Sequence, residues 1–296
     1  MPFIEQKFHI KDKIKLISFL QDTLNYTQKQ AQKCVDKGRV KIKDKPFLDK
    51  SAFVCGDITI SIFKEQDIGI SPIFSTRDFA IFDKPEKILI HPKGRFYHHS
   101  LLDSIRFHLG KEANPINRLD SETSGILLVS KNKNSEIEFK KMFEEKCIQK
   151  EYLAFVFGKI NDCIINLKIK EQDKSKDLGV KSIISNDGRE SITKIKLISY
   201  FENKNISFIK ALPITGRTHQ IRLHLSHIGH RILGECLYGI SDCYARDYLD
   251  SKLNDDDRLA LFGASRLMLH SQRLDFTYKN VRYILSSKID FNINKV

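Results

Sequence analysis

The sequence predicts an α+β protein with a large domain on a mainly antiparallel mixed sheet and a small N-terminal α/β domain. Beyond residue 77 many short apolar stretches typical of strands follow one another, with few helical stretches and no strict alternation of strand and helix. The first sixty or so residues instead read as two helices and a basic strand. Residues 63–76, with Gly69, Ser71 and Pro72 among isolated apolar residues, have the composition of a linker. We therefore expect domains at residues 1–62 and 77–296.

Two helices followed by a strand are predicted for the N-terminal domain. The second helix begins at Thr27, a residue type that caps helix N-termini, and ends at Gly38. The stretch 39–45 then alternates basic and apolar residues, as in a strand. The first helix is indicated by apolar residues at helical spacing, namely Ile14, Ile17, Leu20 and Leu24.

Two rows of basic side chains accompany the second helix and the strand. The helical row is Lys29, Lys33 and Lys37. The strand row, whose side chains would point the same way, is Arg39, Lys41, Lys43 and Lys45. A solvated face is the ordinary explanation of lysine runs, whereas two rows that meet at one turn favour a footprint for phosphate groups. Residues 1–50 hold twelve Lys and Arg against six Asp and Glu, so they contribute +6 to the chain's net charge of +13.

The large domain is predicted to hold many strands and a few helices. Strands are expected at residues 79–82, 87–90, 125–131, 152–157, 164–169, 192–200, 206–212, 267–270 and 281–285. Helices are expected at residues 100–110, from a capping box at Ser135–Glu138 onward, and at 218–228. The polar stretch 170–181 is predicted to be an exposed loop.

The bulk composition indicates a folded protein with a polyanionic partner. The chain has 296 residues, a net charge of +13 and a pI near 9.3, with 41% hydrophobic residues. No apolar run approaches the roughly 20 residues of a membrane helix, and the N-terminus lacks the apolar core of a signal peptide. We expect a cytoplasmic protein whose six scattered cysteines are reduced thiols.

One carboxylate stands out in a hydroxyl-rich turn at residues 117–125, before an apolar strand. Asp120 lies beside Arg118, and it could either bond the local backbone or be held in fixed orientation for chemistry. Glu122 is close but has no evident partner, so a paired acid–base site is not indicated. A buried ionised Asp needs a cation, which Arg222 or Arg118 could provide.

A dense basic segment, residues 215–225, supplies further candidates. Structural surface or capping contacts are the ordinary role of its arginines. Three histidines spaced by three residues, His224, His227 and His230, could bind zinc, but no cysteine or carboxylate joins them at a ligand-like interval. We expect no metal. No glycine-rich phosphate loop or dinucleotide fingerprint occurs, so no nucleotide cofactor is indicated.

From Asp78 onward the chain resembles the RluA-type pseudouridine synthases, and residues 11–62 resemble the alpha-L RNA-binding module of ribosomal proteins and RNA-modifying enzymes. Four blocks carry the first resemblance, in the family's order, and a fifth fits the block near the family's C-terminus. They are Phe82–Pro85 with His91 and Pro92, Arg118–Gly125, Lys150–Ala154, Gly216–Arg222 through Gly234 and Tyr238–Gly239, and Leu267–His270. Asn117 departs from the family, which usually has histidine there, and this affects substrate preference more than activity.

The resemblance implies the pseudouridine synthase fold and a cofactor-free isomerisation. Uracil leaves the ribose C1′, turns, and rejoins it through C5. Asp120 would be the essential carboxylate, either attacking C1′ or removing a ribose proton, with Arg222 as its ionic partner. Tyr152, one of nine tyrosines and on pattern alone a structural residue, would stack on the uracil. Arg118 would enter the RNA stack when the target is flipped out, and Leu269 would close the pocket from below.

RNA is therefore the expected partner, and we expect a monomer. In the large domain Arg217, His219 and Gln220 are expected to contact it. In the N-terminal domain the expected contacts are Lys29, Lys33, Arg39, Lys41 and Lys43.

Three alternatives stay open beside a synthase for large-subunit ribosomal RNA, which the alpha-L resemblance favours. One is a synthase for transfer RNA. Another is a non-catalytic RNA-binding or ribosome-assembly protein, against which the intact Asp120, Tyr152 and Arg222 argue. The third is a metal-dependent nuclease.

Overall fold

The computed structural model describes residues 3–63, 67–91, 100–173, 175 and 177–292. They form two compact units, Met1–Gly69 with His91–Phe107, and Ile70–Ile90 with His108–Val296. The division after Gly69 falls inside the stretch expected to be a linker. Pro92, which belongs to one of the motif blocks, lies outside the described residues. In the described part of the chain, no helix is long and apolar enough to cross a membrane.

The first unit contains a four-stranded antiparallel sheet in the order β1-β4-β2-β3. Its strands are β1 (Phe3–Lys15), β2 (Val40–Ile42), β3 (Lys45–Pro46) and β4 (Phe53–Phe63). The helices α1 (Leu16–Leu24) and α2 (Gln28–Asp36) share the core of this sheet, where Leu20 and Val35 are fully buried. Thr27 caps α2 as predicted, because its side chain accepts a hydrogen bond from the Gln30 N–H.

Two predictions for this unit are wrong in detail. Ile14 belongs to β1, a strand that we did not predict because its charged, mostly exposed positions hide the apolar alternation. The basic strand ends at Ile42, since Lys43 and Asp44 have left-handed backbones (φ 51° and 61°) and form the turn between β2 and β3. Lys45 therefore lies on the neighbouring strand, and the strand row of basic residues is broken.

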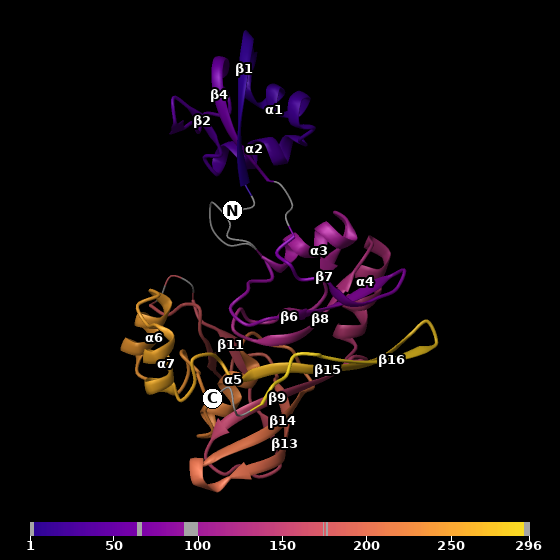
Figure 1. Cartoon of the computed structure of the whole chain (residues 1–296), viewed down its shortest axis with the longest axis vertical. Coiled ribbons are helices and arrows are strands. Elements are labelled where there is room, and N and C mark those ends of the chain that lie inside the picture. Colours follow the sequence, from indigo (N-terminus) through magenta and orange to yellow (C-terminus); the bar gives the residue numbers. More distant parts are fainter. Residues whose placement is uncertain (1–2, 64–66, 92–99, 174, 176, 293–296) are drawn as a thin grey trace. The chain divides into compact units, whose positions relative to one another are not determined.

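The second unit is dominated by a ten-stranded sheet, in the order β10-β13-β14-β9-β15-β8-β6-β5 with β16 beside β15 and β7 beside β8 (Figure 1). Its strands are β5 (Pro72–Ser75), β6 (Phe79–Lys84), β7 (Asn114–Pro115), β8 (Ser124–Ser130), β9 (Gln149–Phe157), β10 (Cys163–Asn166), β13 (Ile192–Phe201), β14 (Ile206–Pro213), β15 (Leu269–Tyr278) and β16 (Val281–Ser286). All of its ladders are antiparallel except the short contact between β15 and β8. The predicted α+β class with a mainly antiparallel sheet is confirmed.

The helices and a small second sheet complete the chain. The helices are α3 (Leu101–Leu109), α4 (Lys133–Glu144), α5 (Gln220–His227), α6 (Asp242–Leu249), α7 (Asp255–Phe262) and the 3-10 turn η1 (Glu202–Lys204). The small sheet pairs β11 (Ile169–Glu171) with β12 (Ser182–Ile184). The helices α6 and α7, which we did not predict, lie side by side and touch through the rings of Tyr244 and Phe262 (Figure 1).

Other elements of the second unit differ locally from prediction. The expected strand at residues 87–90 is turn and irregular backbone, because the Ile88 carbonyl accepts a hydrogen bond from the buried Lys84 ammonium instead of joining a ladder. The cap of α4 is Asn132, whose side chain accepts from the Ser135 N–H, so the predicted capping box does not start the helix. The strand β5 lies inside the expected linker and pairs with β6.

Gly125 makes the parallel contact between β8 and β15 possible. Its φ is +106°, and a Cβ atom there would lie 2.2 Å from the backbone oxygen of Ser271. Both features exclude a side chain, because L residues avoid this backbone region and the neighbour is main chain. The close approach fixes where β8 begins, and with it the turn that contains Asp120.

We expect Gly125→Ala to lower the free energy of unfolding by about 3 kcal/mol or more, from backbone strain and overpacking together. Gly110→Ala is the matched control, because Gly110 has a φ of +90° with nothing within 4 Å of its Cβ position. That control should cost only about 1 kcal/mol. Chemical unfolding curves measure both, and equal losses would contradict the importance of the Ser271 contact.

Candidate active site

Asp120 lies in the turn before β8, with its carboxylate paired to Arg222 of α5. Arg222 Nη1 donates to Asp120 Oδ2 at 2.9 Å, and 28% of the Asp120 side chain is exposed, so a substrate can reach it. Burial alone would raise the pKa of Asp120, but the positive fields of His219, Arg222 and Lys84 hold it below its usual value. The group is therefore an oriented, ionised carboxylate at neutral pH.

Arg222 is held by a second carboxylate that sequence reasoning missed. Its Nε and Nη2 both donate to the carboxylate of Glu235, each at 2.7 Å, and the Glu235 side chain is completely buried. Burial by itself would lower the pKa of Arg222, yet Glu235 and Asp120 together raise it above its usual value. The guanidinium is thus permanently charged and bridges two carboxylates.

His219 is the second positively biased neighbour of Asp120. It caps α5 with a left-handed backbone (φ 57°), and its Nε2 lies 3.7 Å from Asp120 Oδ1. Its Nδ1 is hydrogen-bonded to the Tyr238 hydroxyl at 2.8 Å. That hydroxyl also accepts from the Ser182 N–H at 2.8 Å, and burial raises the pKa of Tyr238 to about 12. The phenol stays protonated, and its hydroxyl fixes the imidazole ring through Nδ1 so that Nε2 faces Asp120.

Lys84, at the end of β6, ties down the other side of the turn. Its buried ammonium donates to the carbonyls of Pro85, Ile88 and Ser121 at 2.8, 3.0 and 2.9 Å. Burial lowers the pKa of Lys84 to about 8, although the negative charges of Asp120 and Glu122 act to raise it. Ser121 follows Asp120 directly, so this lysine fixes the backbone that carries the carboxylate.

Tyr152 and Leu269 lie on one face of the sheet. Tyr152 of β9 is opposite Ser271 of β15, and Leu269 is opposite Ala154, so alternation places all four side chains on the same side. Both Tyr152 and Leu269 are buried. Burial raises the pKa of Tyr152 to about 12; a hydrogen bond with Ser271 opposes this shift, and the Asp120 charge adds to it.

Gln220 is fully engaged inside the protein. Its Oε1 accepts from Thr215 Oγ1 at 2.7 Å and from the Arg217 N–H at 3.0 Å. Its Nε2 donates to the Ile192 carbonyl and to Thr193 Oγ1, both at 3.0 Å. An RNA contact by this carboxamide would require these bonds to open. In the structure it shapes the loop that precedes α5.

Two other predicted RNA contacts lie near this loop. Arg118 Nη2 donates to Thr218 Oγ1 at 3.3 Å, and the Thr218 hydroxyl donates to Glu171 at 2.7 Å. Arg217 Nε donates to the Glu190 carbonyl at 3.3 Å. Both guanidinium groups are at exposed sites, where RNA can replace these single contacts.

The motif positions Asn117 and Glu122 have structural partners. Asn117 Oδ1 accepts from the Leu128 N–H at 3.1 Å, which holds the turn against β8. Glu122 accepts from Arg258 Nη2 at 2.7 Å and from the Tyr248 hydroxyl at 3.3 Å. Sequence reasoning saw no partner for Glu122 because these residues come from α6 and α7, the helices it missed.

The histidine cluster does not converge on a metal site. His224 is buried, its Nδ1 is hydrogen-bonded to Thr193 Oγ1 at 3.0 Å, and burial lowers its pKa to about 4. His230 Nδ1 is bonded to the Phe157 carbonyl at 3.0 Å. Among the residues that the structure describes, no group of three or more His, Cys, Asp or Glu side chains could hold a metal ion.

The predicted RNA contacts of the first unit have different surroundings. Lys29 and Lys33 are exposed on α2, and Lys43 is exposed in the turn after β2. Lys41 is paired with Glu5, and the Arg39 guanidinium lies over the Phe3 ring, 4.2 Å from its centre. The two helical lysines and Lys43 are thus the most accessible of the five.

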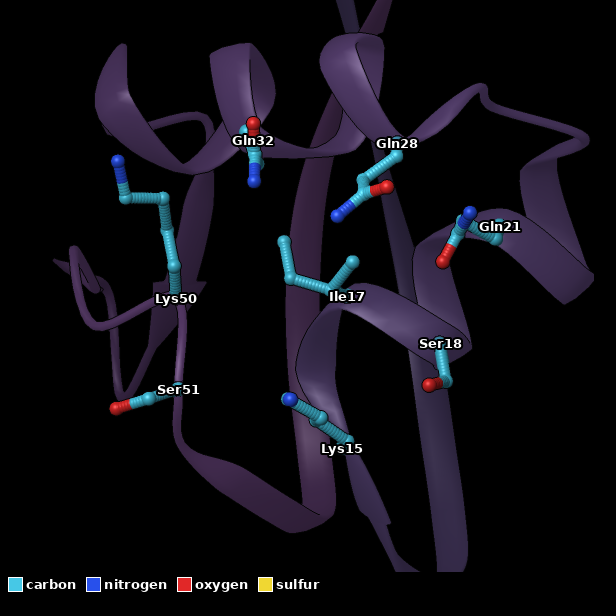
Figure 2. A pocket seen from close by; sticks show the side chains of 8 residues that line it. All are labelled: Lys15, Ile17, Ser18, Gln21, Gln28, Gln32, Lys50 and Ser51. Carbon is cyan, nitrogen blue, oxygen red and sulfur yellow. The ribbon is translucent and has the colours of Figure 1, made fainter.

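A separate hollow of about 370 Å³ lies between α1, α2 and the segment before β4 (Figure 2). Carboxamides, hydroxyls and two ammonium groups surround a single apolar side chain. The lining residues are Lys15, Ile17, Ser18, Gln21, Gln28, Gln32, Lys50 and Ser51. This hollow was not predicted, and none of the five basic residues expected at RNA lines it.

The chain is similar in sequence to known proteins. Residues 78–227 match the family described as RNA pseudouridylate synthase. The chain is 42% identical to a Helicobacter pylori (strain J99) protein described as an uncharacterized RNA pseudouridine synthase, over 97% of this chain and 96% of that one. It is 33% identical to the tRNA pseudouridine(31) synthase of Saccharomyces cerevisiae, over 57% of this chain and 46% of that one.

The fold has a solved counterpart as well. Human RNA Pseudouridylate Synthase Domain Containing 1 superposes with a TM-score of 0.59 at 23% identity, covering 77% of this chain and 86% of that one.

Proposed function

Because the chain belongs to the RNA pseudouridylate synthase family, we propose that it isomerises specific uridines of a structured RNA, with Asp120 as the reacting carboxylate. The observation that carries the assignment to Asp120 is its pairing with Arg222 at 2.9 Å beside a partly exposed turn. An ionised and oriented carboxylate next to a fixed cation can react with a ribose, because it neither protonates nor rotates away.

The neighbouring residues divide the work around that carboxylate. In the reaction the C1′–N1 bond breaks, the uracil turns, a C1′–C5 bond forms, and the proton on C5 is lost while N1 gains one. Asp120 either attacks C1′ or removes a ribose proton. Tyr152, whose pKa of about 12 keeps its hydroxyl protonated at neutral pH, provides an aromatic face and a hydrogen-bond donor for the uracil. Arg118 fills the space of the flipped nucleotide, and Leu269 bounds the pocket.

We propose large-subunit ribosomal RNA as the substrate. The support is a separate N-terminal unit with exposed lysines and a resemblance to the alpha-L module. Transfer RNA is the second candidate, favoured by the name of the yeast relative. Mapping pseudouridines in a strain that lacks the gene separates them. Loss of a large-subunit position supports the proposal, loss of a transfer RNA position alone favours the second candidate, and no loss in either contradicts both.

The lysines of α2 give a prediction about salt dependence. We expect Lys29→Gln with Lys33→Gln to weaken RNA binding and to reduce the slope of log affinity against log salt concentration by roughly 2, because each phosphate contact releases about one counterion. The control is Lys194→Gln with Lys196→Gln, which removes two exposed charges from β13. Filter binding at several salt concentrations measures both pairs, and equal slopes for the two variants would argue against a footprint on α2.

A further inference from the structure

The segment Gly234–Gly239, which follows α5, is held at its start by main-chain contacts. The Gly234 N–H donates to the Phe262 carbonyl at 2.8 Å. A Cβ atom on Gly234 would lie 1.8 Å from the Arg266 carbonyl oxygen, and φ is +73° there and +68° at Gly239. The backbone is therefore fixed at Gly234, where only glycine fits, and residues 234–238 are buried.

Glu235 holds Arg222 more completely than Asp120 does. Its buried carboxylate accepts two bonds from the guanidinium, at 2.7 Å each, and one each from the N–H groups of Leu237 (2.8 Å) and Tyr238 (3.3 Å). Asp120 accepts a single bond from the remaining edge of the same guanidinium. Glu235 thus fixes the plane of the Arg222 guanidinium. Asp120 is then oriented by the remaining donor of that plane, Nη1.

Tyr238, three residues along, controls the other neighbour of Asp120. Its hydroxyl bridges the Ser182 N–H and His219 Nδ1, and the Arg222 guanidinium lies 5.6 Å from its ring centre. His219 in turn presents Nε2 to Asp120 at 3.7 Å. Both groups that flank the carboxylate are therefore held by one short stretch of chain.

We infer that Glu235 and Tyr238 are positioning residues for the reaction, which act on Asp120 through Arg222 and His219 without touching the RNA. The inference rests on the proposed function.

The alternative is that Glu235 only stabilises the fold, as a buried ion pair can. The same unit contains a matched pair, in which Arg258 Nη2 donates to the buried Glu122 at 2.7 Å. That pair resembles the first in burial and geometry, but Arg258 makes no bond to Asp120 among the described hydrogen bonds. Glu122→Gln is therefore the control for the loss of a buried carboxylate.

The test uses the full chain on an RNA that wild type modifies, with single-turnover rate, RNA affinity, thermal unfolding and the pH dependence of the rate as readouts. For Glu235→Gln we expect a rate lower by a factor on the order of 10 to 100, with RNA affinity unchanged. The acid limb of its pH profile should move to higher pH, because Arg222 no longer stays on Asp120 and the lowered pKa of that carboxylate relaxes upward. Tyr238→Phe should show a smaller change in the same direction. Glu122→Gln should keep the wild-type profile.

Each other outcome counts against the inference. A wild-type rate and profile for Glu235→Gln overturns it, as does an equal loss in Glu122→Gln. An acid limb that moves to lower pH shows that Glu235 only neutralises charge, and the positioning role is then wrong. If Glu235→Gln does not fold, the profile of Tyr238→Phe decides. Failure of the proposed function is distinct, since it would show as an inactive wild type or an active Asp120→Asn.

Discussion

Replacing Asp120 with Asn is expected to abolish pseudouridine formation while RNA binding persists. The amide has nearly the same shape and can still accept a bond from Arg222, but it carries no charge and can neither attack the ribose nor take its proton. Loss of an essential catalytic group of this kind lowers the rate by about 10⁴-fold or more. Release of tritium from uracil C5, together with a binding measurement on the same RNA, would record both halves of the expectation.

Asn114→Ala provides a comparison six residues before Asp120, because Asn114 lies on β7 and its side chain binds Glu136 rather than the site. It should keep activity close to wild type. An active Asp120→Asn would remove Asp120 from the chemistry, and loss of RNA binding in that variant would point to a structural role for the turn.

The low pKa of Asp120 also gives a prediction for the wild-type enzyme. Activity should not begin to fall until the pH comes down to about 4, the ordinary pKa of an aspartate side chain.

The second large effect is expected for Arg222→Lys. An ammonium keeps the charge but cannot donate to Glu235 through two nitrogens and to Asp120 through a third in one plane. We expect the rate to fall by roughly 10²- to 10³-fold, since a poorly oriented catalytic group costs that much. Single-turnover kinetics at saturating enzyme measures the loss without a contribution from binding.

Arg258→Lys is the matched control for that variant, because Arg258 is equally buried and bonds a buried carboxylate, Glu122. Both variants should lose comparable thermal stability, and only Arg222→Lys should lose most of its activity. If the two variants lost activity in parallel, the effect would belong to folding and not to the orientation of Asp120.

Local patterns predicted most strands of the large sheet, since each repeats apolar residues along a short stretch, and the motif resemblance predicted the Asp120–Arg222 pair. The partners of those residues were harder to see. Glu235 and Lys84 lie within recognised motif blocks, yet no periodicity marks a carboxylate that binds an arginine thirteen residues away or an ammonium that binds three carbonyls. Their roles depend on backbone geometry that appears only after the sheet has formed.

Long-range pairing also explains the missed elements. The strand β1 is mostly charged and exposed, and it is recognisable only from its ladder with β4, about fifty residues later. The helices α6 and α7 are short and bury few residues, so little of their sequence marks a face toward the core. Their contribution, which includes the Arg258 partner of Glu122, comes from tertiary contacts.

The position of β15 between β9 and β8 has a consequence for how the enzyme matures. Tyr152 lies on β9, in one half of the sheet, and the Asp120 turn leads into β8, in the other half. In the described strand order, only β15 joins the two halves. Among the described strands, β15 is the second-last in the sequence. The two halves therefore cannot pair through β15 until nearly all of the sheet has been synthesised. On the proposed function, we expect a nascent chain to form pseudouridine only after β15 has been synthesised.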